Sequence, residues 1–242
     1  MKTSLKAIEI AKNNRDVYAA VALHPIHVNP STSLRVNSEQ GRTIKDEEFQ
    51  EEQFLKLAKS KEVVAIGETG LDYYYDQSTK SLQKEIFQKF LKIAQRVSKP
   101  VILHSREAAE DILPIIMAER PEIRGVMHCF QENWQFAKII LDMGLYISFT
   151  GLITFTKNQA TFEVIREAPL ERILIETDCP YMTPAFVETS AGKPEPMRGK
   201  RNEPAYVVEV AKKIAEIKKI PLGKVAEQTS QNAIELFKLD IK

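Results

Sequence analysis

The sequence contains few cysteines and no long hydrophobic run. Its two cysteines, Cys129 and Cys179, lie far apart, which excludes a dense disulfide framework and is typical of the reduced thiols of an intracellular protein. No apolar stretch approaches the roughly 20 residues that a membrane-spanning helix needs. Met1–Asn14 carries lysines and a glutamate where a secretory leader has an apolar core, so we expect a cytoplasmic protein with no membrane partner.

An excess of charge of either sign is also missing. The formal net charge is +1, so no global basic field points to nucleic acid, and recognition of a polyanion needs a local patch. The 242 residues are 43% hydrophobic, which is enough for a substantial core. Neither an internal repeat nor a linker stands out, and we expect a single domain over residues 1–242.

Short apolar runs that are typical of buried strands alternate with amphipathic helical segments. The expected strands are Val17–Leu23, Val63–Ile66, Pro100–Leu103, Arg124–Met127, Leu145–Phe149 and Arg172–Glu176. The expected helices are Ser4–Asn13, Lys45–Lys59, Ser81–Val97, Ala108–Ala118 with a bend or break at Pro114, Glu132–Met143, Ala160–Glu167, Ala205–Lys218, Leu222–Gln228 and Ser230–Phe237. This alternation predicts right-handed crossovers and a parallel sheet, either open or closed into a barrel.

The stretch Val63–Asp76, VVAIGETGLDYYYD, is the most unusual in the chain. Its apolar strand runs into Gly67 and the ionisable Glu68, and Gly67 and Gly70 indicate backbone that turns sharply or lies close to another group. The three tyrosines that follow Asp72 favour packing over stacking on unpaired bases.

Charged or imidazole side chains directly follow most of the expected strands. The five residues are His24, Glu68, His104, His128 and Asp178, and they include three of the four histidines. In a parallel barrel the carboxyl ends of all strands lie on one rim, so these side chains converge on a common site. Strands often end on polar residues for no functional reason, but imidazoles and carboxylates together are the ligands of zinc, manganese and similar ions.

The cysteines beside these residues have two interpretations. Cys129 and Cys179 directly follow His128 and Asp178, and in extended backbone neighbouring side chains point to opposite faces. We therefore expect both thiols to face the packed helices and take no part in the site. A zinc site that uses both thiols is the alternative.

Six segments together resemble the TatD family of metal-dependent deoxyribonucleases. They are GETGLDYYYD, VILHSREA, MHCF, ISFTG, ILIETDCPY and RGKRNEPAYV, in this order, and the likeness runs from about Val17 to Phe237. The resemblance implies a TIM-type (β/α)8 barrel of the metal-dependent hydrolase superfamily. It also implies a hydrolase that cleaves phosphodiester bonds of DNA, at ends or in single strands, with Mg, Mn or Zn ions and with no obligate protein partner.

The resemblance also implies roles for individual residues. Glu68 would be a shared metal ligand, His104 and His128 would complete one metal position, and Asp178 would belong to the other and help to activate water. Glu68 and Asp178 would be the catalytic pair. The substrate-binding residues would be His24, Arg106, Arg198, Arg201 and Asn202.

The sequence departs from the family pattern at its beginning. Members start with a strand that carries a His-x-His pair of metal ligands, and this chain has no such motif. Because six strands are expected where a closed barrel needs eight, we also expect two leading strands and the helix between them, on the order of 50 residues in all, to be absent. A fragment, a misplaced start and a true short variant are all compatible with this. Of the two metal positions of a complete chain, we expect one to be well formed here.

A further departure is HCFQENW, where the family usually has a Ser-Gly turn after the phenylalanine, and it affects how this loop meets substrate. The basic loop that contains Lys193, Arg198, Lys200 and Arg201 would grip a nucleic-acid backbone, or is a solvated charge cluster. Three functions stay open: a DNA-cleaving hydrolase, a hydrolase of another ester such as D-aminoacyl-tRNA, and a degenerate barrel with little activity.

Overall fold

The computed structural model describes residues 1–28, 34–37, 42–45, 49–119, 123–188, 194–197 and 199–241. These residues form two compact units, which we call unit 1, Met1–Gly125 with Phe237–Lys242, and unit 2, Val126–Leu236. The single domain over residues 1–242 stays a prediction.

Unit 1 is built on three parallel strands in the order β1-β4-β5. They are β1 (Ala19–Ala20), β4 (Val63–Asp72) and β5 (Val101–Arg106). The sequence predicts that the strand ends at Ile66, but β4 runs on to Asp72 because Thr69 to Asp72 continue to pair with β5. β1 is much shorter than predicted, although Val21 extends its ladder by accepting a hydrogen bond from the Gly67 N–H (3.2 Å).

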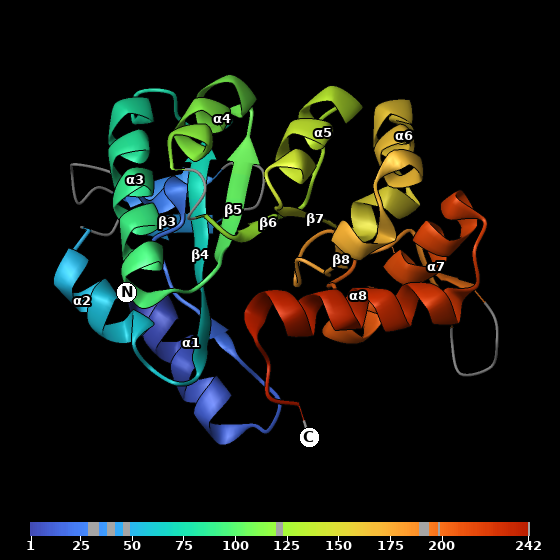
Figure 1. The fold of residues 1–242 in the computed structure, drawn as a ribbon, viewed down its shortest axis with the longest axis horizontal. Coiled ribbons are helices and arrows are strands. Elements are labelled where there is room, and N and C mark those ends of the chain that lie inside the picture. The colour runs from blue at the N-terminus through green and yellow to red at the C-terminus, as the bar shows by residue number, and fades with distance from the viewer. Residues whose placement is uncertain are drawn as a thin grey trace. The chain divides into compact units, whose positions relative to one another are not determined.

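Four helices cover these strands. They are α1 (Lys2–Asn13), α2 (Glu51–Ala58), α3 (Lys80–Val97) and α4 (Ala109–Ala118). Figure 1 shows α3 lying along β4, and the fully buried Phe87 and Phe90 lie on the inner side of this helix. Phe54 of α2 meets Phe90 edge to face with ring centroids 5.0 Å apart, which joins the two helices. The predicted break at Pro114 is wrong, because α4 continues through it.

Between β1 and α2 the described residues contain two more strands. β2 (Leu34–Asn37) and β3 (Arg42–Lys45) pair antiparallel and form a separate two-stranded sheet. Before it, the short 3-10 helix η1 (Pro25–His27) begins directly after His24. This places a tight turn at the carboxyl end of the first strand.

Unit 2 repeats the alternation of strands and helices. Its parallel strands are β6 (Gly125–Met127), β7 (Tyr146–Phe149) and β8 (Ile173–Ile175), in the order β6-β7-β8. Its helices are α5 (Trp134–Asp142), α6 (Gln159–Glu167), α7 (Val207–Lys218) and α8 (Leu222–Phe237). The prediction of two helices over the last segment is wrong: α8 is continuous, and the Thr229 hydroxyl inside it bonds the Val225 carbonyl (2.9 Å).

The remaining short elements of unit 2 lie between its strands and helices. The 3-10 helices are η2 (Gly151–Thr154), η3 (Leu170–Arg172) and η4 (Pro204–Tyr206), and the hairpin strands are β9 (Phe186–Glu188) and β10 (Pro194–Pro196). The described residues therefore hold six strands in parallel ladders, as predicted. Among the helices of the described ranges, none is long and apolar enough to cross a membrane.

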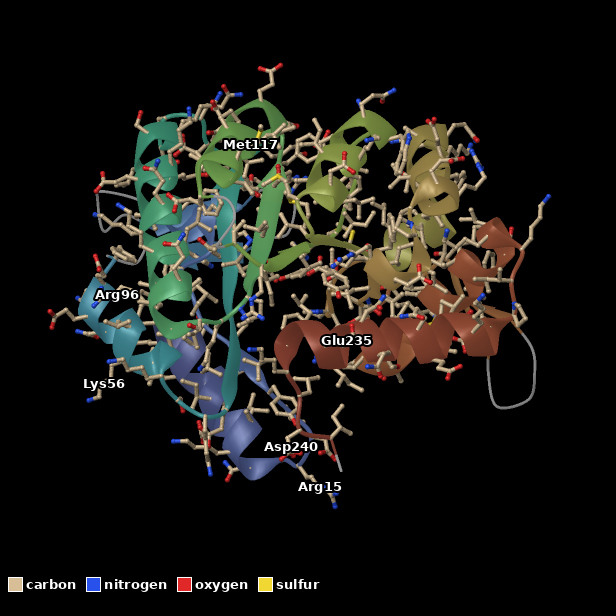
Figure 2. All side chains as sticks on the ribbon, viewed as in Figure 1. Arg15, Lys56, Arg96, Met117, Glu235 and Asp240 are labelled. Carbon is tan, nitrogen blue, oxygen red and sulfur yellow. The ribbon has the colours of Figure 1, made fainter. Side chains whose placement is uncertain are left out.

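Charged side chains lie on the solvent faces of the unit 1 helices (Figure 2). Lys56 of α2 and Arg96 of α3 are exposed, and Arg96 pairs with Glu51 of α2 (3.1 Å). The end of the chain also belongs to unit 1, where the Tyr18 hydroxyl donates to the Asp240 carbonyl (3.0 Å). The candidate functional residues lie at the carboxyl ends of the strands.

Candidate metal centre

Three side chains of unit 1 form a compact group of metal-type donors. The Nε2 of His24 lies 3.5 Å from the Oε2 of Glu68, and the Nδ1 of His104 lies 3.9 Å from the same oxygen. One ligand atom from each residue lies within 4.8 Å of the other two. The two imidazole rings are 4.4 Å apart at their centroids, in an edge-to-face arrangement. We call these residues the His24–Glu68–His104 group.

The turn after the first strand fixes which nitrogen of His24 faces Glu68. His24 is the N-cap of η1, and its Nδ1 accepts a hydrogen bond from the backbone N–H of Ile26 (3.2 Å). Pro25 sits at the first position of the 3-10 helix, where its missing N–H is not needed. The other ring nitrogen, Nε2, is thereby directed at the Glu68 carboxylate. A neutral ring whose Nδ1 accepts a hydrogen bond carries its proton on Nε2, so an ion would bind Nε2 only after that proton moves to Nδ1 and the hydrogen bond from Ile26 is lost.

A buried carboxylate orients His104 in a similar way. The Nε2 of His104 lies 3.0 Å from the Oδ2 of Asp72, whose residue is only 3% exposed. Gln83 holds the Asp72 backbone from both sides, because it accepts from the N–H (2.8 Å) and donates to the carbonyl (2.9 Å). A carboxylate on the far nitrogen of a histidine is the usual outer partner of a metal ligand, since it fixes the ring and raises its basicity.

Sequence reasoning missed this role of Asp72. The residue was visible directly before the tyrosines, but its importance depends on the pairing of β4 with β5, which puts Asp72 opposite Arg106. Had β4 ended at Ile66, as predicted, Asp72 would not lie beside His104.

Glu68 lies at an irregularity in β4. The register with β5 shifts between Ile66 and Thr69, and such bulges redirect a side chain at a strand end. The flanking glycines allow close contact between the strands: a Cβ on Gly67 would lie 2.5 Å from the Ile102 Cβ, and one on Gly70 would lie 2.0 Å from the His104 carbonyl oxygen. Of the two roles predicted for these glycines, the close approach is confirmed and the sharp turn is wrong.

The donor set fits a divalent ion. Two neutral imidazole nitrogens and one carboxylate oxygen are ligands that zinc, manganese and related ions accept. The outer hydrogen bond to buried Asp72 is the second feature expected of such a centre. A metal ion would therefore find oriented ligands on the carboxyl ends of β1, β4 and β5.

A cavity of about 500 Å³ opens beside this group. His24 and Glu68 line one side of it, and Lys2 and Thr3 from the first turn of α1 line another. An ammonium group and the positive end of the α1 dipole favour a negatively charged occupant. The cavity therefore suits an anionic ligand next to the metal-type donors.

Unit 2 contains a second pairing of a histidine with a carboxylate. The Nδ1 of buried His128 lies 3.4 Å from the Oε2 of Glu176, just after β8. The Oε1 of Glu176 accepts hydrogen bonds from the Cys129 backbone N–H (2.6 Å) and the Ser148 hydroxyl (2.8 Å). Burial alone raises the pKa of Glu176, but the positive charge that His128 can carry and these hydrogen bonds hold the pKa below its usual value.

Asp178 lies in a tightly folded loop after β8. Its backbone is left-handed (φ 52°), and its carbonyl accepts a hydrogen bond from the Tyr181 N–H (2.9 Å). Buried Asn202 stabilises the same loop, because its side-chain amide donates to the carbonyls of Thr177 and Tyr181. The amide nitrogen of Asn202 thus holds the loop, and its predicted contact with substrate stays a prediction.

The structure assigns the predicted residues to different parts of the molecule. Glu68 and His104 are brought together in unit 1. His24, which was predicted to face substrate, lies with them, and one ligand atom of each of the three residues is within 4.8 Å of the other two. His128 and Asp178 belong to unit 2, and their predicted shares in the metal positions stay predictions.

The predicted phosphate-binding arginines have different surroundings. Arg106 ends β5 and lies against two tyrosines. Arg201 is exposed in unit 2, while Arg198 and Lys193 lie outside the described residues. Lys200 of the same basic loop is paired with Glu195 (2.7 Å).

The prediction that both thiols face the packed helices is wrong. Cys179 is exposed, and half-buried Cys129 has left-handed backbone (φ 47°). Asp178 is left-handed as well, so the backbone is not extended at either cysteine. The alternation of faces on which the prediction depended therefore does not apply.

Comparisons with known proteins identify the family of the chain. The family model described as "TatD related DNase" matches residues 1–238. A relative from Bacillus subtilis, named an uncharacterized metal-dependent hydrolase YabD, is 38% identical over 239 residues, which is 98% of this chain and 84% of the relative. The Escherichia coli K12 relative YcfH, named in the same way, is 41% identical over 190 residues, 78% of this chain and 68% of its own length.

Solved structures show the same fold. The crystal structure of the Escherichia coli TatD homologue YJJV matches with a TM-score of 0.78 at 25% identity, covering 98% of this chain and 83% of that one. A TatD family hydrolase from Entamoeba histolytica matches with a TM-score of 0.73 at 24% identity over 97% and 80% of the two chains. The predicted fold class, an α/β chain of the TIM-barrel type with six parallel strands, is confirmed.

The fold and the oriented imidazole and carboxylate ligands define a metal-dependent hydrolase. Because the family model covers nearly the whole chain, the family follows directly. The chain belongs to the TatD family.

Proposed function

We propose that this TatD-family protein hydrolyses phosphodiester bonds of DNA with water activated at a divalent metal ion. The observation that carries the proposal is the His24–Glu68–His104 group, whose three ligand atoms lie within 4.8 Å of one another and whose histidine rings are oriented by separate hydrogen bonds. The description of the matching family model, a TatD related DNase, supports DNA as the substrate.

In this proposal the group in unit 1 holds the ion. A bound divalent ion lowers the pKa of water and stabilises negative charge on phosphoryl oxygens. Asp72 keeps the ring of His104 in place, and the Ile26 N–H does the same for His24. His104, whose Nε2 points at the Asp72 carboxylate, would therefore present the lone pair of its Nδ1 to an ion without reorientation. His24 would bind through Nε2 once its ring proton has moved to Nδ1.

Asp178 is the proposed proton acceptor. A carboxylate near neutral pH is ionised, and it can orient a water molecule and take up its proton during attack on phosphorus. Its position on a loop that Asn202 pins through two carbonyls supports this role, since a general base needs a fixed geometry. Glu176 in turn orients His128, the other strand-end histidine of unit 2.

The phosphates of the substrate are neutralised by cationic side chains. Lys2 lines the cavity beside the metal group, and Arg106 ends the strand that carries His104. Arg201 and Arg198 are the proposed contacts in the basic loop. Binding through phosphates predicts affinity that falls steeply as salt concentration rises, with little reading of the base sequence.

The test is nucleotide release from labelled single-stranded and duplex DNA with Mg, Mn or Zn, and with a chelator. We expect metal-dependent release that Glu68→Gln reduces at least 100-fold, because the shared oxygen facing both histidines is lost. Glu85→Gln makes the same change on exposed α3 and serves as the matched control. D-aminoacyl-tRNA is assayed in parallel: its hydrolysis without any release from DNA would contradict the proposal, as would release that the chelator does not affect.

A further inference from the structure

The three tyrosines that follow β4 have unlike surroundings. Tyr73 is 3% exposed, and its hydroxyl donates to Asp111 of α4 (2.9 Å), so it is a packing residue, as the sequence favours. Tyr74 is 38% exposed although it is part of the same run. Packing explains the first tyrosine and leaves the second unexplained.

Arg106 lies over this exposed ring. Its guanidinium carbon is 3.6 Å from the centroid of the Tyr74 ring and 5.0 Å from that of Tyr75. The Arg106 side chain also donates to the Tyr75 hydroxyl (2.9 Å), and the two tyrosine rings meet at 90° with centroids 4.8 Å apart. Each contact limits the motion of the others, so the stack is preorganised. We call these three residues the Tyr74–Arg106 stack.

The stack lies on the same strand ends as the metal-type donors. His104 and Arg106 are two residues apart on β5, so they point to the same face at a separation of about 6.6 Å along the strand. Pairing puts Gly70 opposite His104 and Asp72 opposite Arg106, and the Tyr73 N–H extends the ladder to the Arg106 carbonyl (3.0 Å). The stack is therefore about one nucleotide away from the His24–Glu68–His104 group.

We infer that the Tyr74–Arg106 stack is a binding site for an unpaired base of single-stranded DNA next to the scissile phosphate. This inference rests on the proposed function and adds the residues that would contact a base beside the scissile phosphate. An exposed tyrosine ring backed by a guanidinium offers a π-face to any base, while the charge of Arg106 attracts the neighbouring phosphate.

The test measures binding and does not need cleavage. Fluorescence anisotropy in the presence of a chelator compares a labelled oligothymidylate with an abasic oligonucleotide of the same length and charge. We expect the wild-type protein to bind the base-containing strand roughly tenfold more tightly, since stacking of one base accounts for a change of that order. Tyr74→Ala should remove this difference, and Tyr74→Phe, which keeps the ring, should retain it.

Two results would overturn the inference: equal binding of the two oligonucleotides by the wild-type protein, or a preference for bases that survives Tyr74→Ala. The first needs no variant, so a folding defect cannot obscure it. The proposed function fails independently, because a protein that never cleaves DNA could still show the base preference. A protein that cleaves DNA without that preference would keep the proposed function and lose this site.

Discussion

Two hydrogen bonds decide which ring nitrogens of His24 and His104 face a metal ion. The Ile26 N–H occupies Nδ1 of His24, and the Asp72 carboxylate occupies Nε2 of His104. The Nε2 of His24 and the Nδ1 of His104 therefore point at Glu68. Buried Asp72 thus matters for the site although it lies outside the ligand group.

We predict that Asp72→Asn weakens metal binding by about 10- to 100-fold while the fold is retained. The amide keeps the size of the side chain and the backbone contacts with Gln83, but it removes the charge that raises the basicity of His104. Calorimetric titration with Zn measures the affinity. Asp76→Asn, which makes the same change in a turn that bonds Ser78, is the control. Unchanged affinity in Asp72→Asn would show that His104 is not a ligand oriented by this carboxylate.

The pairing of β4 with β5 places the ligands relative to one another. It brings Gly70 directly opposite His104, where the backbones are so close that a Cβ would lie 2.0 Å from the His104 carbonyl oxygen. Gly70 also has a positive φ of 146°, which other residues rarely adopt. The strand pair consequently depends on glycine at this position.

We predict that Gly70→Ala lowers the free energy of unfolding by about 1–3 kcal/mol and weakens metal binding with it, because the added methyl displaces β5 at His104. Chemical denaturation measures the first effect and calorimetry the second. Gly223→Ala is the control: it lies in the first turn of α8, and a Cβ there meets nothing within 4 Å. Its stability should stay the same or rise slightly. A Gly70→Ala variant as stable as Gly223→Ala would contradict this account of the strand pair.

The strand-end pattern, an apolar run followed by an ionisable residue, predicted that all three residues of the group lie at one sheet edge. The family resemblance divided their roles, with Glu68 and His104 as metal ligands and His24 as a contact to substrate. The length of β4 was not predictable, because pairing with β5 overrides the two glycines. For the same reason the carboxylates Asp72 and Glu176, which orient histidines across strands, could not be recognised from their own segments.

Across the residues that the structure describes, six parallel strands are divided between two compact units. Unit 1 carries the group that can hold a metal ion, and unit 2 carries the His128–Glu176 pair and Asp178. The alternation of apolar runs with amphipathic segments predicted both the α/β class and the number of strands, since both depend on burial patterns within short segments. Membership of the TatD family adds hydrolysis as the activity.

The most direct test is the number of divalent ions that the chain binds, measured by calorimetric titration after removal of metal. The account predicts that the wild-type protein binds one more ion than a folded variant in which His24 and His104 are alanine and Glu68 is glutamine. Equal stoichiometry and equal affinity in the two proteins would contradict it, because the three side chains that lie within 4.8 Å of one another would then have no part in holding a metal.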